Sequence, residues 1–246
     1  MARQFTASNT ERFRVTGIAV TAVPVTMACW FYPTNAGGND YCMMQLTDAS
    51  QSGQYFRLGL AGGDGLGLEP MASVSGAGQF RAAIASAEST LNNWHHACGT
   101  WTSTTDRNAF LDGGNKTTNT TAGNLPTGLD VTDIGYEGDT SPGDPWDGRL
   151  ADCAIWNVEL TDAEVAILAL GFSPLQVRPD ALQFFAPLNQ VSGDERDIIG
   201  GLTLADVNSV TDADGPPLRR PTAQILQFPP AAAAPAGNPH YYYAQQ

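Results

Sequence analysis

The side chains best suited to chemistry are the carboxylates of one acidic loop, residues 137–147, which reads EGDTSPGDPWD. Asp139 and Asp144 in this loop, together with Asp48 in another turn, supply the hard oxygen ligands that Ca²⁺ prefers. They do not follow a recognised ligand spacing, and such Gly- and Pro-containing segments are commonly solvated turns. The sequence therefore offers these three residues as calcium ligands, with an ordinary surface loop as the alternative.

Paired carboxylates for acid–base catalysis are harder to find. Glu159, Asp162 and Glu164 gather at the start of a predicted helix, where capping and the helix dipole already account for acidic residues. Glu69 and Glu88 stand alone, so no pair has surroundings that would separate an acid from a base. We therefore expect no catalytic residues and no enzymatic activity.

The histidines and cysteines indicate neither a metal centre nor a redox motif. His95 and His96 are adjacent on a predicted strand, so they point to opposite faces and cannot chelate one metal ion together. The cysteines are Cys29, Cys42, Cys98 and Cys153. They show no Cys-x-x-Cys spacing and lie in predicted strands, which favours buried free thiols and leaves a disulfide across a sandwich open.

Sugar binding would need exposed aromatic rings beside hydrogen-bonding side chains. Tyr136 comes directly before the acidic loop and Trp146 lies near its end, while Asn35 and Asn39 lie in a turn that follows a predicted strand. The sequence offers these four residues as glycan contacts. Aromatic residues near strands commonly pack in the core instead, and that alternative stays open.

The element that must position these side chains spans residues 146–172. Residues 150–156 alternate in polarity, which predicts a half-buried strand. The residues expected on one face of it are Ala151, Cys153 and Ile155. A helix should follow, because Thr161 and Glu164 match a capping box and Gly171 can end it. Its apolar side would hold Val165, Ile167, Leu168 and Leu170.

This order of an aromatic residue, Asp-Gly, a strand, aromatic-Asn and an acidic helix resembles the terminal segment of laminin-G-like domains, which are concanavalin A-like lectin and glucanase jelly rolls. The residues that carry it are Trp146, Asp147, Gly148, Leu150, Ile155, Trp156, Asn157, Leu160, Thr161 and Glu164. Two upstream segments match in the expected order, VTMACWFYP at 25–33 and WHHACGTWTSTTDRNAFLDG at 94–113. The resemblance spans residues 4–188.

The resemblance implies an all-β fold in which two antiparallel sheets form a jelly-roll sandwich with one short helix. It also implies calcium at a sheet rim, and a Trp-His-His strand in which one histidine hydrogen-bonds a neighbouring turn. Glucanases of this fold carry a Glu-x-Asp-x-Glu strand, to which this sequence has no match. We therefore expect the fold without the hydrolytic activity.

Composition agrees with such a sandwich and excludes some partners. The 246 residues are 42% hydrophobic and 15% charged, with 26 glycines and 16 prolines, which fits short strands joined by tight turns. The formal net charge of −13 repels a phosphate backbone, so we expect no nucleic-acid partner. No segment has the roughly 20 apolar residues that span a bilayer, and residues 1–13 lack the apolar core of a signal peptide.

From residue 216 the sequence changes to a tail rich in proline and alanine. We expect a laminin-G-like domain over residues 1–215 and an interaction tail over residues 216–246. The side chains offered for partner contacts are Arg219, Arg220, Ile225, Phe228, Tyr241, Tyr242 and Tyr243. They could dock on a neighbouring subunit, or the tail could pack on its own domain.

A leaderless acidic sandwich with such a tail resembles the virion proteins of tailed bacteriophages in its layout. That resemblance implies a non-enzymatic structural protein that decorates a capsid or tail, assembled in the host cytoplasm into an oligomeric virion. The tail would contact other virion subunits, and the jelly roll could bind host glycans. A free-standing carbohydrate-binding lectin module is the first alternative, and a glycan hydrolase is the second.

Overall fold

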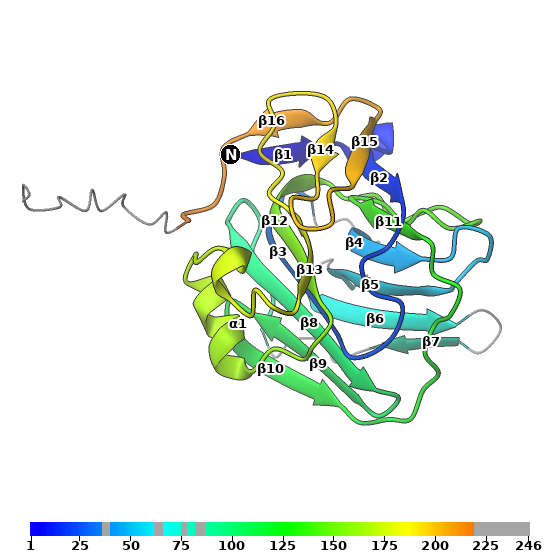
Figure 1. The fold of residues 1–246 in the computed structure, drawn as a ribbon. Coiled ribbons are helices and arrows are strands. Elements are labelled where there is room, and N and C mark those ends of the chain that lie inside the picture. Colours follow the sequence, from blue (N-terminus) through cyan, green and yellow to red (C-terminus); the bar gives the residue numbers. More distant parts are fainter. Residues whose placement is uncertain (36–39, 62–65, 75–77, 82–86, 219–246) are drawn as a thin grey trace, which may run out of the picture.

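Two antiparallel β-sheets packed face to face make up the fold, as the sequence predicts (Figure 1). The computed structural model describes residues 1–35, 40–61, 66–74, 78–81 and 87–218. One α-helix lies against the outside of the first sheet in this part of the chain. Within these ranges, no helix combines the length and apolar character needed to cross a bilayer.

The first sheet, sheet A, has eight strands. Seven lie in the order β10 (Gly114–Asn119), β9 (Asp106–Leu111), β8 (His95–Ser103), β3 (Val25–Pro33), β12 (Gly148–Trp156), β1 (Ala2–Phe5) and β16 (Thr211–Ala213). The eighth strand, β13 (Leu182–Ala186), pairs with the second half of β12, while β1 pairs with its first half.

Sheet B has eight strands as well and forms the other layer. Its order is β14 (Glu195–Arg196), β15 (Thr203–Val207), β2 (Arg12–Thr16), β11 (Val131–Ile134), β4 (Tyr41–Thr47), β5 (Tyr55–Leu60), β6 (Leu68–Val74) and β7 (Gly78–Arg81). A 3-10 turn, η1 (Ala7–Asn9), carries the chain from β1 in one sheet to β2 in the other. Phe5 and Phe13 meet between the sheets, with ring centroids 5.8 Å apart.

Strand β3 shows how alternation builds the core. Its inner face contributes four residues to the main core cluster, Val25, Met27, Cys29 and Phe31, all fully buried. The residues between them face away from the core, because successive side chains of a strand point to opposite sides of the sheet. Ala28 and Trp30 belong to separate clusters on the outer face of sheet A.

Strand β12 contains a β-bulge, and because of it one residue, Ala151, faces the side opposite to the one predicted. Cys153 and Ile155 join the main core as expected, but Ala151 packs on the outer face with Trp30. The pairing with β3 shifts register between Ala151 and Ala154, and Asp152 has a positive φ of 49°. The extra residue inverts the alternation, and a bulge of this kind leaves no mark in the pattern of residue types.

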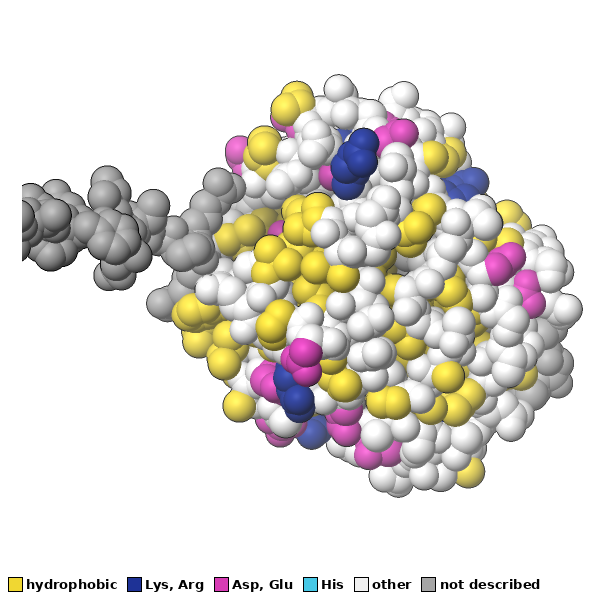
Figure 2. Space-filling view, in the orientation of Figure 1, with side chains coloured by type: hydrophobic (Ala, Val, Ile, Leu, Met, Phe, Trp, Pro, Cys, Tyr) yellow, Lys and Arg dark blue, Asp and Glu magenta, His cyan; other side chains and the backbone are white. Residues whose placement is uncertain are grey.

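Helix α1 (Asp162–Ala169) begins at the predicted cap. Thr161 and Glu164 form both hydrogen bonds of a capping box. Val165 and Leu168 are buried in a second apolar cluster, between the helix and sheet A. Ile167 and Leu170, which the sequence places on the same apolar side, are instead 40% and 54% exposed. Figure 2 shows hydrophobic side chains at the surface beside α1 and over β13.

The packed part of the chain continues past β16. Pro216 is buried, and Leu218 packs against an outer-face cluster that contains Trp30 and Ala151. A further 3-10 turn, η2 (Pro174–Gln176), connects α1 to β13. All four cysteines are buried free thiols, as expected. The tail residues named from the sequence, beginning at Arg219, lie outside the described residues.

Candidate functional site

The acidic loop singled out from the sequence crosses the outer face of sheet B. Trp146 N, near the end of the loop, donates a 2.9 Å hydrogen bond to the carbonyl of Gly135, two residues before the loop begins. Arg14 Nη1, on β2, donates to the carbonyl of Gly138 over 2.8 Å, and the loop also reaches Arg57 on β5. The loop therefore spans from β2 to β5 across the two strands between them.

Arg57 is the residue around which this loop is organised, and sequence patterns did not single it out. Its side chain is 1% exposed and forms ion pairs with Asp40 at 3.2 Å, with Glu137 at 2.7 Å, and with Asp144. One guanidinium thus faces three carboxylates. Burial raises the pKa of Glu137 to about 7 even though Arg57 acts to lower it. The cluster is a clamp that fastens the loop to the sheet.

A second ion pair supports the start of the loop. Arg14 Nη1 lies 3.0 Å from Oδ2 of Asp133, a fully buried carboxylate on β11. Burial raises the pKa of Asp133 to about 6, against the opposing effect of Arg14. A Cβ at Gly138 would lie 2.2 Å from both Arg14 Nη1 and Asp133 Oδ2, so only glycine leaves room for this pair.

The predicted calcium ligands do not fit a calcium site in this arrangement. Asp144 is an ion-pair partner of Arg57. Asp139 accepts hydrogen bonds from Gly53 N and Ser141 N, both at 2.6 Å, and Asp48 Oδ1 accepts from the backbone and hydroxyl of Ser50. Across the described ranges, no three Asp, Glu, His or Cys side chains are grouped to hold a metal ion. A guanidinium supplies the positive charge that a cation would bring.

The predicted glycan contacts lie in different environments. Trp146 is 1% exposed and packs edge-on against Phe31, with centroids 5.9 Å apart. Tyr136 is 9% exposed, with the Arg12 guanidinium 4.9 Å from its ring centre. Both rings are therefore packing residues in this structure and offer no face to an external sugar. Asn35 is exposed, with its amide 3.3 Å from Asp147, while Asn39 lies outside the described residues.

Two partly exposed aromatic rings beside hydrogen-bonding side chains lie on the outer face of sheet A. Tyr32 on β3 and Trp94 just before β8 are both half-buried, with ring centroids 5.5 Å apart. Arg149 on β12 pairs with Tyr32 in the sheet register and places its guanidinium 4.7 Å from that ring. Gln4 on β1 follows Arg149 in the same row and accepts a 3.4 Å hydrogen bond from its Nε. We call these four residues the aromatic row.

The signal for the aromatic row was present in the sequence. Alternation along residues 25–33 puts Trp30 and Tyr32 on the side of the strand opposite the core. Each ring on that side is therefore either open to solvent or covered by another part of the chain. Trp30 is covered, at 7% exposure, by packing against Ala2, Ala151 and the nearby Trp94 and Leu218. The neighbour that completes the row, Arg149, is distant in sequence and could not be placed without the strand pairing.

The predicted role of one histidine in bracing a turn is confirmed. His95 Nδ1 lies 2.8 Å from Asp112, and its Nε2 accepts a 3.0 Å hydrogen bond from the backbone N–H of Thr90. The Thr90 hydroxyl is also 3.0 Å from Nε2, which superficially matches a nucleophile–base–acid triad. Because the backbone N–H already occupies the Nε2 lone pair, the arrangement holds the turn and lacks a free base.

These features define a lectin-like jelly-roll sandwich. The model of the concanavalin A-like lectin/glucanases superfamily matches residues 7–166, and the chain belongs to this superfamily. No curated protein sequence matches the chain. Solved structures of the same fold are similar at low identity.

A proposed carbohydrate-binding protein from Bacteroides ovatus ATCC 8483 has 16% identity and a TM-score of 0.59, over 87% of this chain and 60% of that chain. The SAP-like pentraxin from Limulus polyphemus, a native heptamer, has 16% identity and a TM-score of 0.54, over 68% and 81%. Domain 4 of the arabinanase AbnA from Geobacillus stearothermophilus, in complex with arabinotriose, has 16% identity and a TM-score of 0.50, over 61% and 68%.

Proposed function

We propose that this protein is a carbohydrate-binding module whose contact surface is the aromatic row on sheet A. The observation that carries the proposal is the pair of half-buried rings, Tyr32 and Trp94, beside the guanidinium of Arg149. Sugar rings present apolar C–H faces and hydroxyl edges, so they bind where an aromatic face adjoins hydrogen-bonding groups. The names of the similar structures from Bacteroides ovatus and of the arabinanase domain, which also refer to carbohydrate, support this class of ligand.

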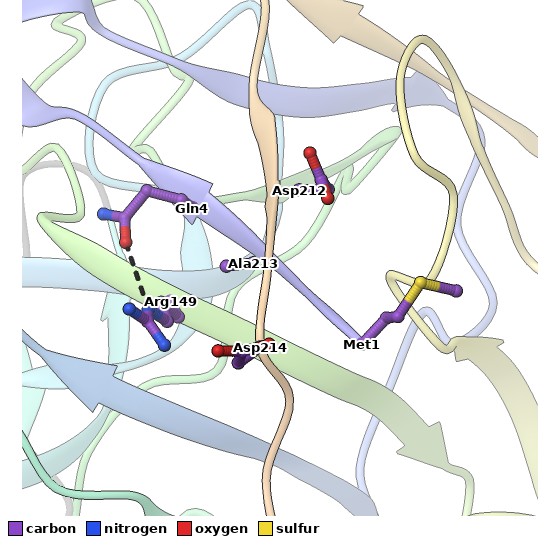
Figure 3. A pocket seen from close by; sticks show the side chains of 6 residues that line it. All are labelled: Met1, Gln4, Arg149, Asp212, Ala213 and Asp214. Carbon is purple, nitrogen blue, oxygen red and sulfur yellow. Dashed lines mark hydrogen bonds between the residues drawn. The ribbon is translucent and has the colours of Figure 1, made fainter.

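The geometry of the row explains how it would act. Tyr32 lies in β3 and Trp94 directly precedes β8, so the sheet holds both rings and little conformational entropy is lost when a sugar stacks on them. Tyr32 is held by two neighbours, the Arg149 guanidinium 4.7 Å from its ring centre and the Trp94 ring, whose centroid is 5.5 Å away. Gln4, at the end of the row, donates to the carbonyls of Phe5 and Gly148 and accepts from Arg149 Nε (Figure 3), so it holds Arg149 in place. A flat, preorganised surface of this kind suits an oligosaccharide lying across strands β1, β12 and β3.

The test is a glycan array followed by calorimetric titration of the best ligand. Trp94→Ala and Tyr32→Ala should each weaken binding at least tenfold, which corresponds to about 1.4 kcal/mol. Phe172→Ala provides a matched control, since Phe172 is a half-buried aromatic residue on a different segment, after α1. An array with no specific binding, or ligands whose affinity is unchanged in both row variants, would overturn the proposal.

We infer that the module binds without catalysis. The acidic cluster around Arg57 brings three carboxylates together, and each of them is ion-paired with that guanidinium. A glycan hydrolase needs one carboxyl group to give up a proton and another to attack or activate water. Release of reducing ends from any bound glycan, lost in Glu137→Gln, would contradict this inference.

The role as a virion structural protein rests on the layout of the sequence and remains a proposal. It requires residues 219–246 to contact other subunits, and the last described residue before them, Leu218, packs against the cluster that contains Trp30. Chain lacking residues 219–246 should then fold normally and fail to enter the assembly. Incorporation equal to that of the full chain would exclude the tail as the attachment.

A further inference from the structure

Helix α1 is apolar on the side that faces away from sheet A as well as on the side that packs against it. Val165 and Leu168 are buried toward the sheet. Ala163, Ile167 and Leu170 follow the spacing i, i+4 and i+7, which places them on one face of a helix, and all three are exposed. We call these three residues the outer stripe. Figure 2 shows hydrophobic side chains at the surface beside the helix.

The outer stripe differs from the solvent face of an ordinary surface helix. Such a helix carries polar or charged residues opposite its buried face, whereas a helix that is apolar all round is normally covered all round. Residues 165–177 include no charged residue, although 15% of the chain is charged. Ile167 and Leu170 are nevertheless 40% and 54% exposed. The stripe therefore has the composition of a contact surface.

The charged groups that border the outer stripe are already paired with one another. Lys116 lies 2.8 Å from Asp162, and Arg178 lies 2.6 Å from Glu164, on the two flanks of the helix start. These two ion pairs have no net charge. The whole chain has a formal net charge of −13, so two copies repel each other overall. A second copy meets less repulsion at this uncharged surface than at an acidic one.

The outer stripe is also complementary to itself. A two-fold axis through its middle, near Ile167, makes the two helices antiparallel and sets the small Ala163 of each copy against the large Leu170 of the other. The last turn of α1 has no basic residue to offset the partial negative charge at the helix end. In the antiparallel pair, Lys116 and Arg178 of each copy come close to that end of the other helix, where cationic side chains are favourable.

We propose that α1 is the contact through which two copies of this chain form a two-fold dimer, with the outer stripe at its centre. Burial of the exposed apolar side chains drives the association. The proposal is independent of glycan binding, since the aromatic row shares no residue with the stripe. A dimer carries two aromatic rows, so it would bind a repeated glycan with higher avidity than a single chain does.

Sedimentation of the full chain over a range of concentrations tests the dimer. Wild type should have the mass of two chains and dissociate on dilution. Ile167→Glu places a charge beside the two-fold axis, where it meets the same charge of the other copy, and should weaken the dimer at least tenfold. Val191→Glu is the matched control, because Val191 is 66% exposed and lies between β13 and β14, outside the stripe. At concentrations where wild type is monomeric, thermal unfolding should be the same in all three proteins.

Cross-linking gives an independent measurement of which surfaces meet. Ile167→Cys puts a thiol close to the same thiol of the other copy, and a short bis-maleimide then joins two chains by adding one thiol to each of its double bonds. The four native cysteines are buried, so they should not compete for the reagent. Val191→Cys, treated in the same way, should remain a single chain on a denaturing gel.

A wild-type protein that sediments as a single chain at every concentration would overturn the proposal, whether the stripe is then open to solvent or covered by residues 219–246. A dimer that Ile167→Glu leaves intact would overturn it as well, since another surface would hold the two copies together. Neither result involves a sugar. Failure of the dimer and failure of the proposed glycan binding are therefore distinguishable.

Discussion

Arg57 Nη1 donates a 2.7 Å hydrogen bond to Oε2 of Glu137, which joins the middle of sheet B to the loop that crosses it. Arg57 is almost fully buried, whereas its acidic partners are partly exposed. A buried guanidinium with several carboxylates is therefore the point at which the loop is fastened. The stability of this loop should depend on one side chain.

Replacing Arg57 with Met tests this fastening. Methionine fills a similar volume, but it leaves three carboxylates close together without a cation, and breaking a buried ion pair commonly costs about 3–5 kcal/mol. We expect the free energy of unfolding in urea to fall by about 3 kcal/mol. Arg178→Met is the control, because Arg178 is 43% exposed and pairs with a single acid, Glu164. Equal losses in both variants would show that burial of the pair is irrelevant.

The same cluster predicts how the protein responds to calcium. In wild type the guanidinium already occupies the position between Asp40, Glu137 and Asp144 and pairs with each of them, so the melting temperature should be the same in CaCl₂ and in chelator. Removal of the guanidinium leaves a group of hard oxygen ligands, which a divalent cation could bridge. Arg57→Met should therefore be stabilised by calcium. Calcium-dependent stabilisation of wild type would contradict this expectation.

The free energy of unfolding should depend on pH through two buried carboxyl groups, those of Asp133 and Glu137. Burial raises the pKa of Asp133 to about 6 and that of Glu137 to about 7, both above the values of an unfolded chain. These two groups then bind more protons in the folded protein than in the unfolded chain between about pH 4 and pH 7, so their contribution to the free energy of unfolding falls as pH rises through this range.

Urea unfolding at a series of pH values measures this fall. Asp133→Asn should flatten the part below about pH 6, and Glu137→Gln the part that extends to about pH 7. Asp112 and Glu164, whose pKa values are lowered, act in the opposite direction, so the difference between variant and wild type is the informative quantity. If the free energy of unfolding of both variants changes with pH in parallel with wild type, Asp133 and Glu137 do not cause the pH dependence.

The helix cap is the local feature that could be predicted best. Thr161 accepts a 3.3 Å hydrogen bond from Glu164 N, and Glu164 in turn accepts from Thr161 N over 2.8 Å. Thr161→Ala removes the first bond and should lower the free energy of unfolding by about 1 kcal/mol. Thr161→Ser, which keeps the hydroxyl, should restore most of it. A loss shared by both variants would point to packing of the methyl group instead.

Features that depend on residues close in sequence could be predicted, whereas features that join residues distant in sequence could not. The cap at Thr161 and the alternation of residues 25–33 depend on near neighbours, so residue types reveal them. The clamp joins Asp40, Arg57 and Glu137, and the aromatic row joins β1, β12 and β3, so both depend on strand order. Trp146 was predicted as a glycan contact because its neighbours are polar, but the loop turns its ring into the core.

The position of Leu218 predicts where the chain can be cut. Leu218 packs against Ala2, Trp30 and Ala151, and Pro216 just before it is buried. Ending the chain after Leu218 should leave the urea-unfolding midpoint unchanged, because every described contact is kept. Ending it at Gly215 exposes apolar surface around Trp30 and should lower the midpoint, at about 25 cal/mol for each Å² uncovered.

Intrinsic tryptophan fluorescence provides a second measurement for this comparison, since Trp30 becomes more accessible to a quencher such as acrylamide only in the shorter chain. Leu218→Ala in the full chain is the matched variant, and it should reproduce part of the loss without removing the segment. Identical midpoints and quenching in the two truncated chains would place the end of the domain at residue 215. A loss in both would mean that residues beyond 218 also support the fold, and the domain would then have to be defined by the whole tail.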